Sequence, residues 1–334
     1  MKRRIRHRFA EALTPWGRRS FYSDVLAQSP RLIVLSGGSP QYVSAVLLHL
    51  LSESPLDNFD AYHALWSPME IVGVFCHERR VNIIPSAIID QDTMGSLPAT
   101  VQPVHLKGPH TAWPRVSHRT SRLLAIAKYA HDEMEARIKP HIITAEVDSV
   151  RQLLLRLVPL QSSTGSKGGK IRHFFGGSLT PTGWVDFLPE EFNDLEVRIS
   201  FQGTFGLDHT SLIRWFGERI SFVGYDVDFY HCEWDSSHVD HIVAPSLKLG
   251  VTLATAPHAL EPRSSDISID MRHWLSPHHE DLLPLINTFQ TGINQTLNRL
   301  YEETASLVNS TDLQGIDQDV ALLRKVLNES LILS

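Results

Sequence analysis

The stretch that decides the fold occurs twice in this chain. The first copy reads Arg6-His7-Arg8-Phe9, then Leu13-Thr14-Pro15 and Gly17. The second copy reads Arg172-His173-Phe174-Phe175, then Leu179-Thr180-Pro181 and Gly183. Every match keeps a separation of 166 residues, and so do the later pairs Phe21 with Phe187 and Gly37 with Gly203. Two unrelated segments would not hold one separation for so long, so the pattern predicts an internal duplication.

The repeat continues toward the C-terminus with small changes in separation, as loop insertions produce. Phe59-Asp60 matches Tyr225-Asp226 at 166, whereas Tyr62-His63 and Trp66 match Tyr230-His231 and Trp234 at 168. The polar, glycine-rich residues 163–170 between the copies are typical of a flexible linker. We therefore predict two domains, residues 1–162 and 171–334, and expect residues 171–334 to fold alone.

Composition limits the classes of protein to consider. The chain has 334 residues, 42% hydrophobic and 20% charged, which is typical of a globular protein of two domains. Its net charge of -6 disfavours a nucleic-acid partner. Its two cysteines provide no disulfide framework and fit a reducing cytosol. No apolar run approaches the roughly 18 residues that a membrane span needs, so we expect a cytoplasmic protein without membrane association.

Each copy alternates apolar runs with helical patterns. Glycine-bounded apolar runs at 32–35 and 197–201 predict a buried strand, and a helical pattern follows at 43–51 and 210–220. Further strands are expected at 58–63 and 81–84, and at 225–231 and 249–254. This order predicts parallel sheets with crossover helices. Helical appendages are expected at 122–138, 147–157, 282–307 and 317–332.

A loop of the length of a phosphate-binding loop follows the first predicted strand of each copy. The two loops read Gly37-Gly38-Ser39-Pro40-Gln41-Tyr42-Val43-Ser44 and Gly203-Thr204-Phe205-Gly206-Leu207-Asp208-His209-Thr210. Such a loop wraps backbone N–H groups around a phosphate, adds a lysine for charge and uses a hydroxyl to hold Mg²⁺. The opening glycine and the hydroxyl remain in both copies, but Val43 and His209 replace the lysine. The pattern predicts P-loop NTPase ancestry without the charge that phosphoryl transfer requires.

At this point the chain resembles a family of uncharacterised bacterial ATPase-like proteins built from tandem P-loop NTPase domains. The resemblance is clearest in the second copy, in three segments: His173-Phe174-Phe175 with Leu179-Thr180-Pro181, Gly224-Tyr225-Asp226-Val227 with Tyr230-His231-Cys232, and Thr255-Ala256-Pro257-His258. His131-Asp132-Glu133 is similar to the helical segment of the family. The resemblance implies the fold and ATP with Mg²⁺ as ancestral ligands. This chain departs from the family at both lysines and at the Walker B acid, whose position falls on Leu253 and near Pro85.

Two hypotheses about function follow. The favoured one is a non-hydrolysing binding or scaffold protein, a pseudo-ATPase that acts through a protein partner. The alternative is a slow ATPase or nucleotide-binding regulator that uses the loop of the second copy, with His209 partly replacing the lysine. Either way, the residues expected at the ancestral nucleotide sites are Gly37, Gly38, Ser44, Gly203, Gly206, His209, Thr210 and His258.

A metal site in the second copy is a weaker hypothesis. Cys232, His238 and His241 lie close in sequence and carry ligand types that suit Zn²⁺. The first copy has no such cluster around Trp66, and the chain has 18 histidines, which favours chance clustering. We expect structural or solvated histidines here rather than a metal centre.

Overall fold

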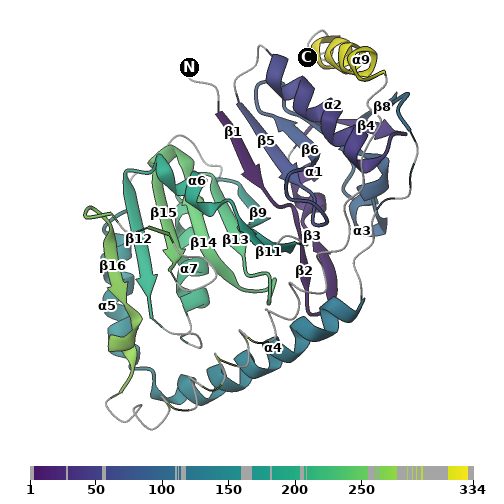
Figure 1. Ribbon diagram of the computed structural model, residues 1–334. Helices are drawn as coiled ribbons and strands as arrows, with labels where there is room; N and C mark the ends of the chain where they lie inside the picture. The colour runs from purple at the N-terminus through teal and green to yellow at the C-terminus, as the bar shows by residue number, and fades with distance from the viewer. Residues whose placement is uncertain are drawn as a thin grey trace.

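Two six-stranded sheets form the centre of the protein (Figure 1). The computed structural model describes residues 4–27, 29–54, 58–109, 111, 113, 118–158, 168–180, 183–203, 207, 209–254, 260–261, 263–276, 284, 288, 291, 295 and 315–329. The first sheet has the order β1-β5-β6-β7-β4-β8, and the second, from its opposite edge, has β9-β13-β14-β15-β12-β16. Corresponding strands hold corresponding places, which is consistent with the predicted duplication.

The strands of the first sheet are β1 (Arg4–Arg8), β4 (Arg31–Ser36), β5 (Asn58–His63), β6 (Ile71–Cys76), β7 (Val81–Pro85) and β8 (Thr100–His105). Those of the second are β9 (Ile171–Phe175), β12 (Val197–Gln202), β13 (Val227–His231), β14 (Val239–Ala244), β15 (Leu249–Leu253) and β16 (Ile267–Asp270). Short 3₁₀ helices occur at Ser86–Ile88, Lys139–His141, Pro245–Leu247 and Met271–Trp274.

The sheets are mixed, so the expectation of fully parallel sheets is wrong. Strand β6 runs antiparallel to both β5 and β7, and β14 runs antiparallel to both β13 and β15. The reason is the length of the connections: residues 64–70 and 77–80 are too few for a helical crossover, whereas an antiparallel neighbour needs only a turn. The predicted third strand of each copy, β7 or β15, is therefore the fifth strand along the chain within its sheet.

The repeated Leu-Thr-Pro-x-Gly motif builds a tight hairpin in each half. The hairpins are β2 (Glu11–Thr14) with β3 (Gly17–Ser20), and β10 (Gly177–Thr180) with β11 (Gly183–Asp186). Gly17 and Gly183 adopt φ values of 105° and 106°, a conformation that glycine reaches without strain. In each turn the threonine hydroxyl donates to the glycine carbonyl at 2.8 Å. A one-turn helix follows, α1 (Tyr22–Ala27) or α6 (Leu188–Asn193).

Longer helices cover the sheets. Each central strand leads into a helix of 14 residues, α2 (Pro40–Glu53) after β4 and α7 (His209–Phe222) after β12. Helix α3 (Gln91–Met94) is a single turn before β8. The predicted appendages appear as α4 (His118–Ile138), α5 (Thr144–Leu155) and α9 (Ile316–Glu329). Most of 282–307 lies outside the described residues. None of the described helices combines the length and apolar character needed to cross a bilayer.

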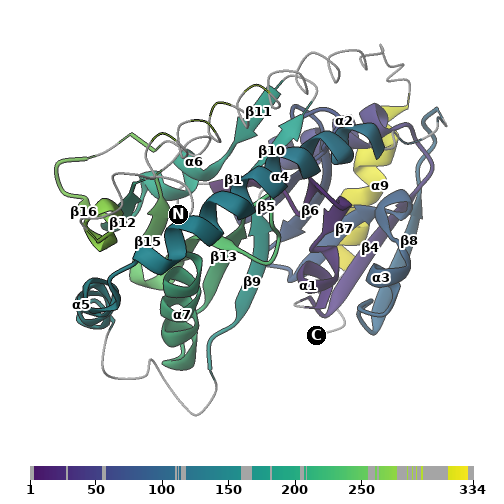
Figure 2. The ribbon, with the colours of Figure 1, turned by 90° about the horizontal axis from the view of Figure 1, so that it is seen from below.

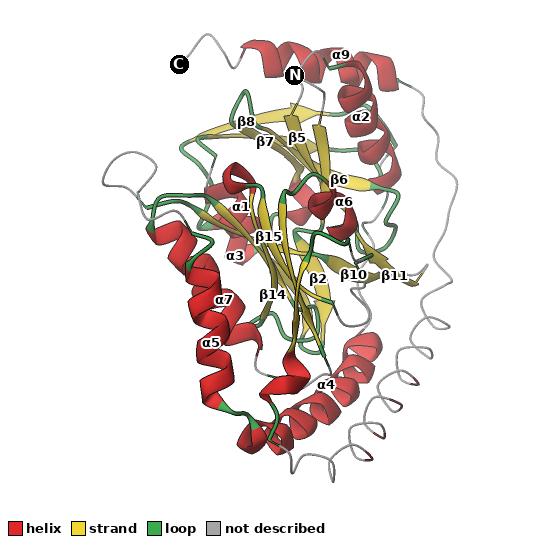
Figure 3. Cartoon of the chain, turned by 90° about the vertical axis from the view of Figure 1, so that its left-hand side faces the viewer, coloured by secondary structure: helices red, strands yellow, loops and turns green. Residues whose placement is uncertain are grey.

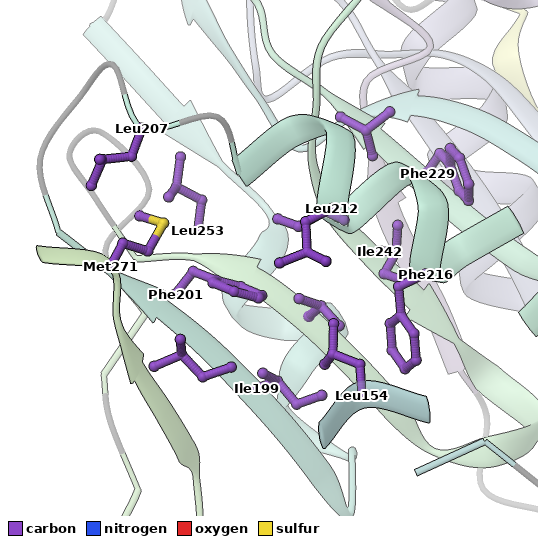
Figure 4. Close-up of a cluster of buried hydrophobic side chains, with 14 of the residues drawn as sticks. Leu154, Ile199, Phe201, Leu207, Leu212, Phe216, Phe229, Ile242, Leu253 and Met271 are labelled. Atoms are coloured by element: carbon purple, nitrogen blue, oxygen red, sulfur yellow. The ribbon is translucent and has the colours of Figure 1, made fainter. Parts of the chain in front are cut away.

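The appendages are exchanged between the two halves. Helix α4 begins beside the hairpin of the first half and ends in the core of the second, where Met134 and Ile138 are buried (Figure 2). Helix α5 packs beside α7, and its Leu154 faces Ile199 and Phe201 of β12 (Figure 4).

Conversely, α9 of the second half lies on α2 of the first and buries four side chains there (Figure 3). These are Val320, Leu323, Val326 and Leu327. The core of the second half is thus completed by residues before the linker, and that of the first by residues after it. This replaces the expectation that residues 171–334 fold alone.

The halves meet around a local two-fold axis. Phe9 and Phe175 are equivalent residues, and they pair with each other in an antiparallel bridge. On either side, Arg6 binds Asp60 at 2.7 Å and Arg172 binds Asp228 at 2.5 Å. The register of β1 on β5 and of β9 on β13 therefore makes Asp60 equivalent to Asp228, not to Asp226. Equivalent residues of β5 and β13 are thus 168 residues apart from the start of these strands. The sequence-based match of Asp60 with Asp226 is therefore wrong.

One residue breaks this symmetry. Arg8 is fully buried, donates to Glu191 at 2.8 Å and to Asp228 at 2.7 Å, and lies 4.3 Å above the ring of Phe174. Phe174 is the residue that corresponds to Arg8 in the second copy of the repeat. A single buried guanidinium therefore links both carboxylates of the second half to the first half.

Candidate functional site

The loop after β4 in the first half is short and closed. Gly37 and Gly38 have φ values of 84° and 78°, and helix α2 already begins at Pro40. Ser39 caps the helix, because its hydroxyl accepts the N–H of Tyr42 at 3.2 Å. Ser39 thus binds one of the free backbone N–H groups in the first turn of α2. Free N–H groups of this kind hold the phosphate in a phosphate-binding loop.

The side chain of Tyr42 fills the space beside this loop. The ring is fully buried, and a Cβ atom added at Gly108 would lie 2.3 Å from it. The Tyr42 hydroxyl donates to Asp319 Oδ2 at 2.8 Å, and the Lys107 backbone N–H donates to the same oxygen at 2.8 Å. Asp319 belongs to the exchanged helix α9 and is itself fully buried. An aromatic ring and a buried carboxyl group therefore occupy the space beside the loop that follows β4.

The two loops are not of equal length, contrary to the sequence comparison. Helices α2 and α7 begin and end at a separation of 169 residues, not 166, so the second half has three more loop residues. Thr210 is the second residue of its helix, whereas Ser44 is the fifth. The Ser44 hydroxyl accepts the N–H of Ile71 at 2.9 Å and supports β6. Ser44 is therefore a structural residue and not a partner of Thr210.

In the second half, a histidine and a carboxyl group face each other at the start of α7. His209 is the first residue of the helix; its Nδ1 lies 2.7 Å from the carbonyl oxygen of Leu207, and its Nε2 lies 3.2 Å from Asp240 Oδ1. Both ring nitrogens therefore lie within hydrogen-bond distance of an oxygen atom. The ring is held by the protein at both ends, and Asp240 is almost completely buried.

Asp240 is the functional candidate that sequence reasoning missed. It lies at the start of β14, and because β14 is antiparallel to β15, this start meets the carboxyl ends of the parallel strands. Leu253 and Pro85, the positions expected for the Walker B acid, are buried strand ends without a carboxylate. The acid next to α7 comes instead from the neighbouring strand. The sequence did contain an indication of this residue, because Asp240 interrupts the apolar run Val239–Ala244. That run forms a strand that was not predicted.

Thr210 adds a hydroxyl to this arrangement. Its Oγ1 is buried and has no hydrogen-bond partner among the residues that the structure describes. A hydroxyl and a carboxylate at a helix start are ligand types that suit Mg²⁺. Gly203, with a φ of 159°, follows β12 as expected. Gly206 and His258 lie outside the described residues.

The weak metal candidates Cys232, His238 and His241 are not brought together as a ligand group within the described part of the chain. His241 is buried on β14, with Nδ1 2.8 Å from the Thr252 hydroxyl. His238 Nε2 lies 3.6 Å from Asp235. Burial and the nearby carboxylates of Asp240 and Glu233 raise the pKa of the Cys232 thiol, which disfavours the thiolate that a metal needs.

Two histidine pairs flank the local two-fold axis. His7 Nδ1 lies 2.8 Å from His63 Nε2, and His173 Nδ1 lies 2.8 Å from His231 Nε2. His63 and His231 each direct Nδ1 at a carbonyl oxygen 2.6 Å away. Burial, followed by the neighbouring histidine, lowers the pKa of His63 to about 4 and that of His231 to about 3. Both rings are therefore neutral near pH 7 and act as fixed parts of the interface.

Comparison of the chain with protein-family models, with curated proteins and with solved structures finds no match.

Proposed function

We propose that this chain is a P-loop NTPase-like binding or scaffold protein that does not hydrolyse nucleotide and acts through a protein partner. The observation that carries the proposal is the start of α2 in the first half, where the Tyr42 ring is fully buried and its hydroxyl donates to the buried carboxyl group of Asp319. A phosphate group bound at this helix start would have to lie next to that carboxyl group. Such a contact is strongly unfavourable in a dry environment.

The second half supports the same conclusion for hydrolysis. Phosphoryl transfer depends on positive charge placed on the transferring group. The residue nearest to the lysine position is His209, and its Nε2 already faces Asp240 at 3.2 Å. This pairing leaves little net positive charge at the helix start. A γ-phosphate would have to compete with Asp240 for the ring.

A second candidate function, a nucleotide-binding regulator or slow ATPase, is favoured by two observations in the second half. Within the described part of the chain the buried Thr210 hydroxyl has no hydrogen-bond partner, and the Asp240 carboxylate lies beside the same helix start. Together these groups could hold Mg²⁺ with a bound nucleotide. In this candidate the first half is the inactive copy and the second is the sensor.

Calorimetry with ATP, ADP and GTP in the presence of Mg²⁺ separates the two candidates. The full chain is compared with Thr210→Ala and Asp240→Asn, with the neighbouring exposed Ser211→Ala as the matched control. The scaffold proposal expects no heat at high micromolar nucleotide and ATP turnover at background in all four proteins. Binding or turnover that Thr210→Ala and Asp240→Asn remove, and Ser211→Ala keeps, would overturn it in favour of the regulator.

A further inference from the structure

Helix α4 meets the turn between β13 and β14 in an unusually polar contact. The helix comes from the first half of the chain, whereas the turn belongs to the second. Lys128 of α4 is almost completely buried, binds Asp132 on its own helix and lies 3.0 Å from Asp235 of the turn. The ring of His131 stands edge-on to Trp234, with centroids 6.3 Å apart. Titratable side chains thus join the exchanged helix to the second sheet.

Three side chains of α4 converge at this contact. His131, Asp132 and Glu135 each offer one ligand atom, and all three atoms lie within 4.8 Å of one another. His131 and Glu135 are four residues apart, so both project from one face of the helix. Asp132 is 42% exposed, which leaves an entry path from solvent. Imidazole and carboxylate ligands together suit a divalent ion such as Zn²⁺.

The charge of the surroundings points independently to a cation. Asp132 and Asp235 both pair with Lys128, and Asp132 also lies in one group with Glu135, so the ion pairs of the described residues provide one lysine for these three carboxylates. Three negative charges against one positive charge leave a deficit of two. Partly buried carboxylates in excess are costly unless paired or bound to a metal.

The turn also brings a second histidine to the contact. His238 Nε2 lies 3.6 Å from Asp235 Oδ2, and Asp235 is fixed by the N–H of Ser237 at 3.0 Å. The contact therefore contains two histidines, His131 of α4 and His238 of the turn.

We propose that His131, Asp132 and Glu135 form a binding site for one divalent transition-metal ion of the Zn²⁺ class. The ion balances the carboxylates of α4 at the place where this helix meets the turn between β13 and β14. The site is separate from the start of α7 and does not depend on nucleotide binding. It also differs in composition from the set Cys232, His238 and His241.

The test uses the metal-free full chain, titrated with ZnCl₂ by calorimetry and with Co²⁺ by visible absorption. We expect one site per chain and a rise in thermal midpoint with Zn²⁺. His131→Gln should weaken binding at least about tenfold, about 1.4 kcal/mol. His49→Gln is the matched control, since His49 and Glu53 have the same spacing on α2 and pair with each other at 2.9 Å.

A second variant moves the affinity in the opposite direction. Lys128→Gln removes the cation that competes for Asp132, so Zn²⁺ should bind more tightly than to the unchanged chain. A purely structural cluster would give no such gain. Absence of Zn²⁺ binding to the unchanged chain, or equal affinity of His131→Gln and His49→Gln, would overturn the proposal.

Discussion

The starts of α2 and α7 hold equivalent places in the two halves, yet their environments differ. At the start of α2, Ser39 caps the helix, the ring of Tyr42 fills the adjoining space and Asp319 closes it. At the start of α7, three extra loop residues precede a polar group of His209, Thr210 and Asp240. The counterpart of Asp240 at a separation of 168 is the buried Val72. The helix start of the first half is therefore filled by packed side chains, whereas that of the second half has polar groups at the edge of its sheet.

The difference teaches that the strand order and the side chains at the helix starts depend on separate residues. The strand order, the hairpins and the Arg–Asp pairs at the two-fold axis are the same in both halves. These features stabilise the structure and remain in both copies. The side chains at the helix starts contribute little to the strand order, so they were free to diverge.

The largest expected effect comes from the residue that breaks the symmetry most strongly. Arg8→Met removes the guanidinium and leaves Glu191 and Asp228 buried without it. We expect a loss of about 4 kcal/mol in the free energy of unfolding, as for other broken buried ion pairs. Urea unfolding followed by circular dichroism measures this loss.

Arg137→Met is the control for Arg8→Met, because Arg137 is exposed and pairs with Glu133 on the surface of α4. A surface pair of this kind contributes at most about 1 kcal/mol. Similar losses for Arg8→Met and Arg137→Met would show that the buried guanidinium does not link the halves.

The exchange of helices predicts reciprocal effects on the two halves. Leu154 of α5 and Leu323 of α9 are each 0% exposed, and each lies in the core of the other half. Leu154→Ala and Leu323→Ala should each cost about 3 kcal/mol. Their neighbours Leu153 and Leu322 are 37% and 39% exposed, so the same change there should have a much smaller effect. Hydrogen exchange should show Leu154→Ala loosening β12 and Leu323→Ala loosening α2; the reverse assignment would contradict the exchange.

The histidine pairs predict acid sensitivity. The pKa values of His63 and His231 fall to about 4 and 3 on folding, from 6.5, so the unfolded chain binds more protons between these values. Stability is therefore complete above pH 6.5 and is lost as the pH falls toward 4. Each histidine should contribute about 1.4 kcal/mol per pH unit to the slope. His63→Gln should remove one such contribution, and an unchanged slope from urea unfolding at pH 6 to 4.5 would count against it.

The smallest effect concerns the closed loop itself. Tyr42→Phe keeps the ring and removes the hydroxyl that donates to Asp319, so we expect a loss of about 1 kcal/mol. Nucleotide binding should not appear, because the ring still fills the space. Tyr129→Phe, at a tyrosine 72% exposed, is the matched control for stability. A nucleotide site that appeared in Tyr42→Phe would mean that the hydroxyl contact alone had closed the loop.

Much of the architecture was predictable from local patterns. The repeated Leu-Thr-Pro-x-Gly motif marks the halves, and glycine-bounded apolar runs locate β4 and β12 correctly. The sequence analysis missed β6 (Ile71–Cys76) and β14 (Val239–Ala244). Each follows the preceding strand after a short turn, so its apolar run did not stand out as a separate strand. The exchange of α5 and α9 could not be predicted from the sequence. The pattern of an amphipathic helix shows that one face is apolar but not which sheet this face covers.

The candidate site was predictable only in part. His209 and Thr210 were located at a helix start, but Ser44 was matched to Thr210 because a shift of a few residues leaves a helical pattern almost in phase. Asp240 could not be placed without knowing that its strand is antiparallel. Asp240 lies beside α7 because the start of β14 meets the carboxyl ends of the parallel strands. Strand direction depends on how the strands pair and not on composition.

The reciprocal placement of α5 and α9 has a consequence for synthesis on the ribosome. The first sheet is complete in sequence once residue 105 has emerged, yet the side chains that cover α2 lie at 316–329. Almost the whole chain must therefore be translated before the N-terminal half can close its core. Domain-by-domain folding during translation, the usual order for a protein of this size, is not open to it. Until residues 316–329 have been made, the side of α2 that α9 covers has no partner within the nascent N-terminal half.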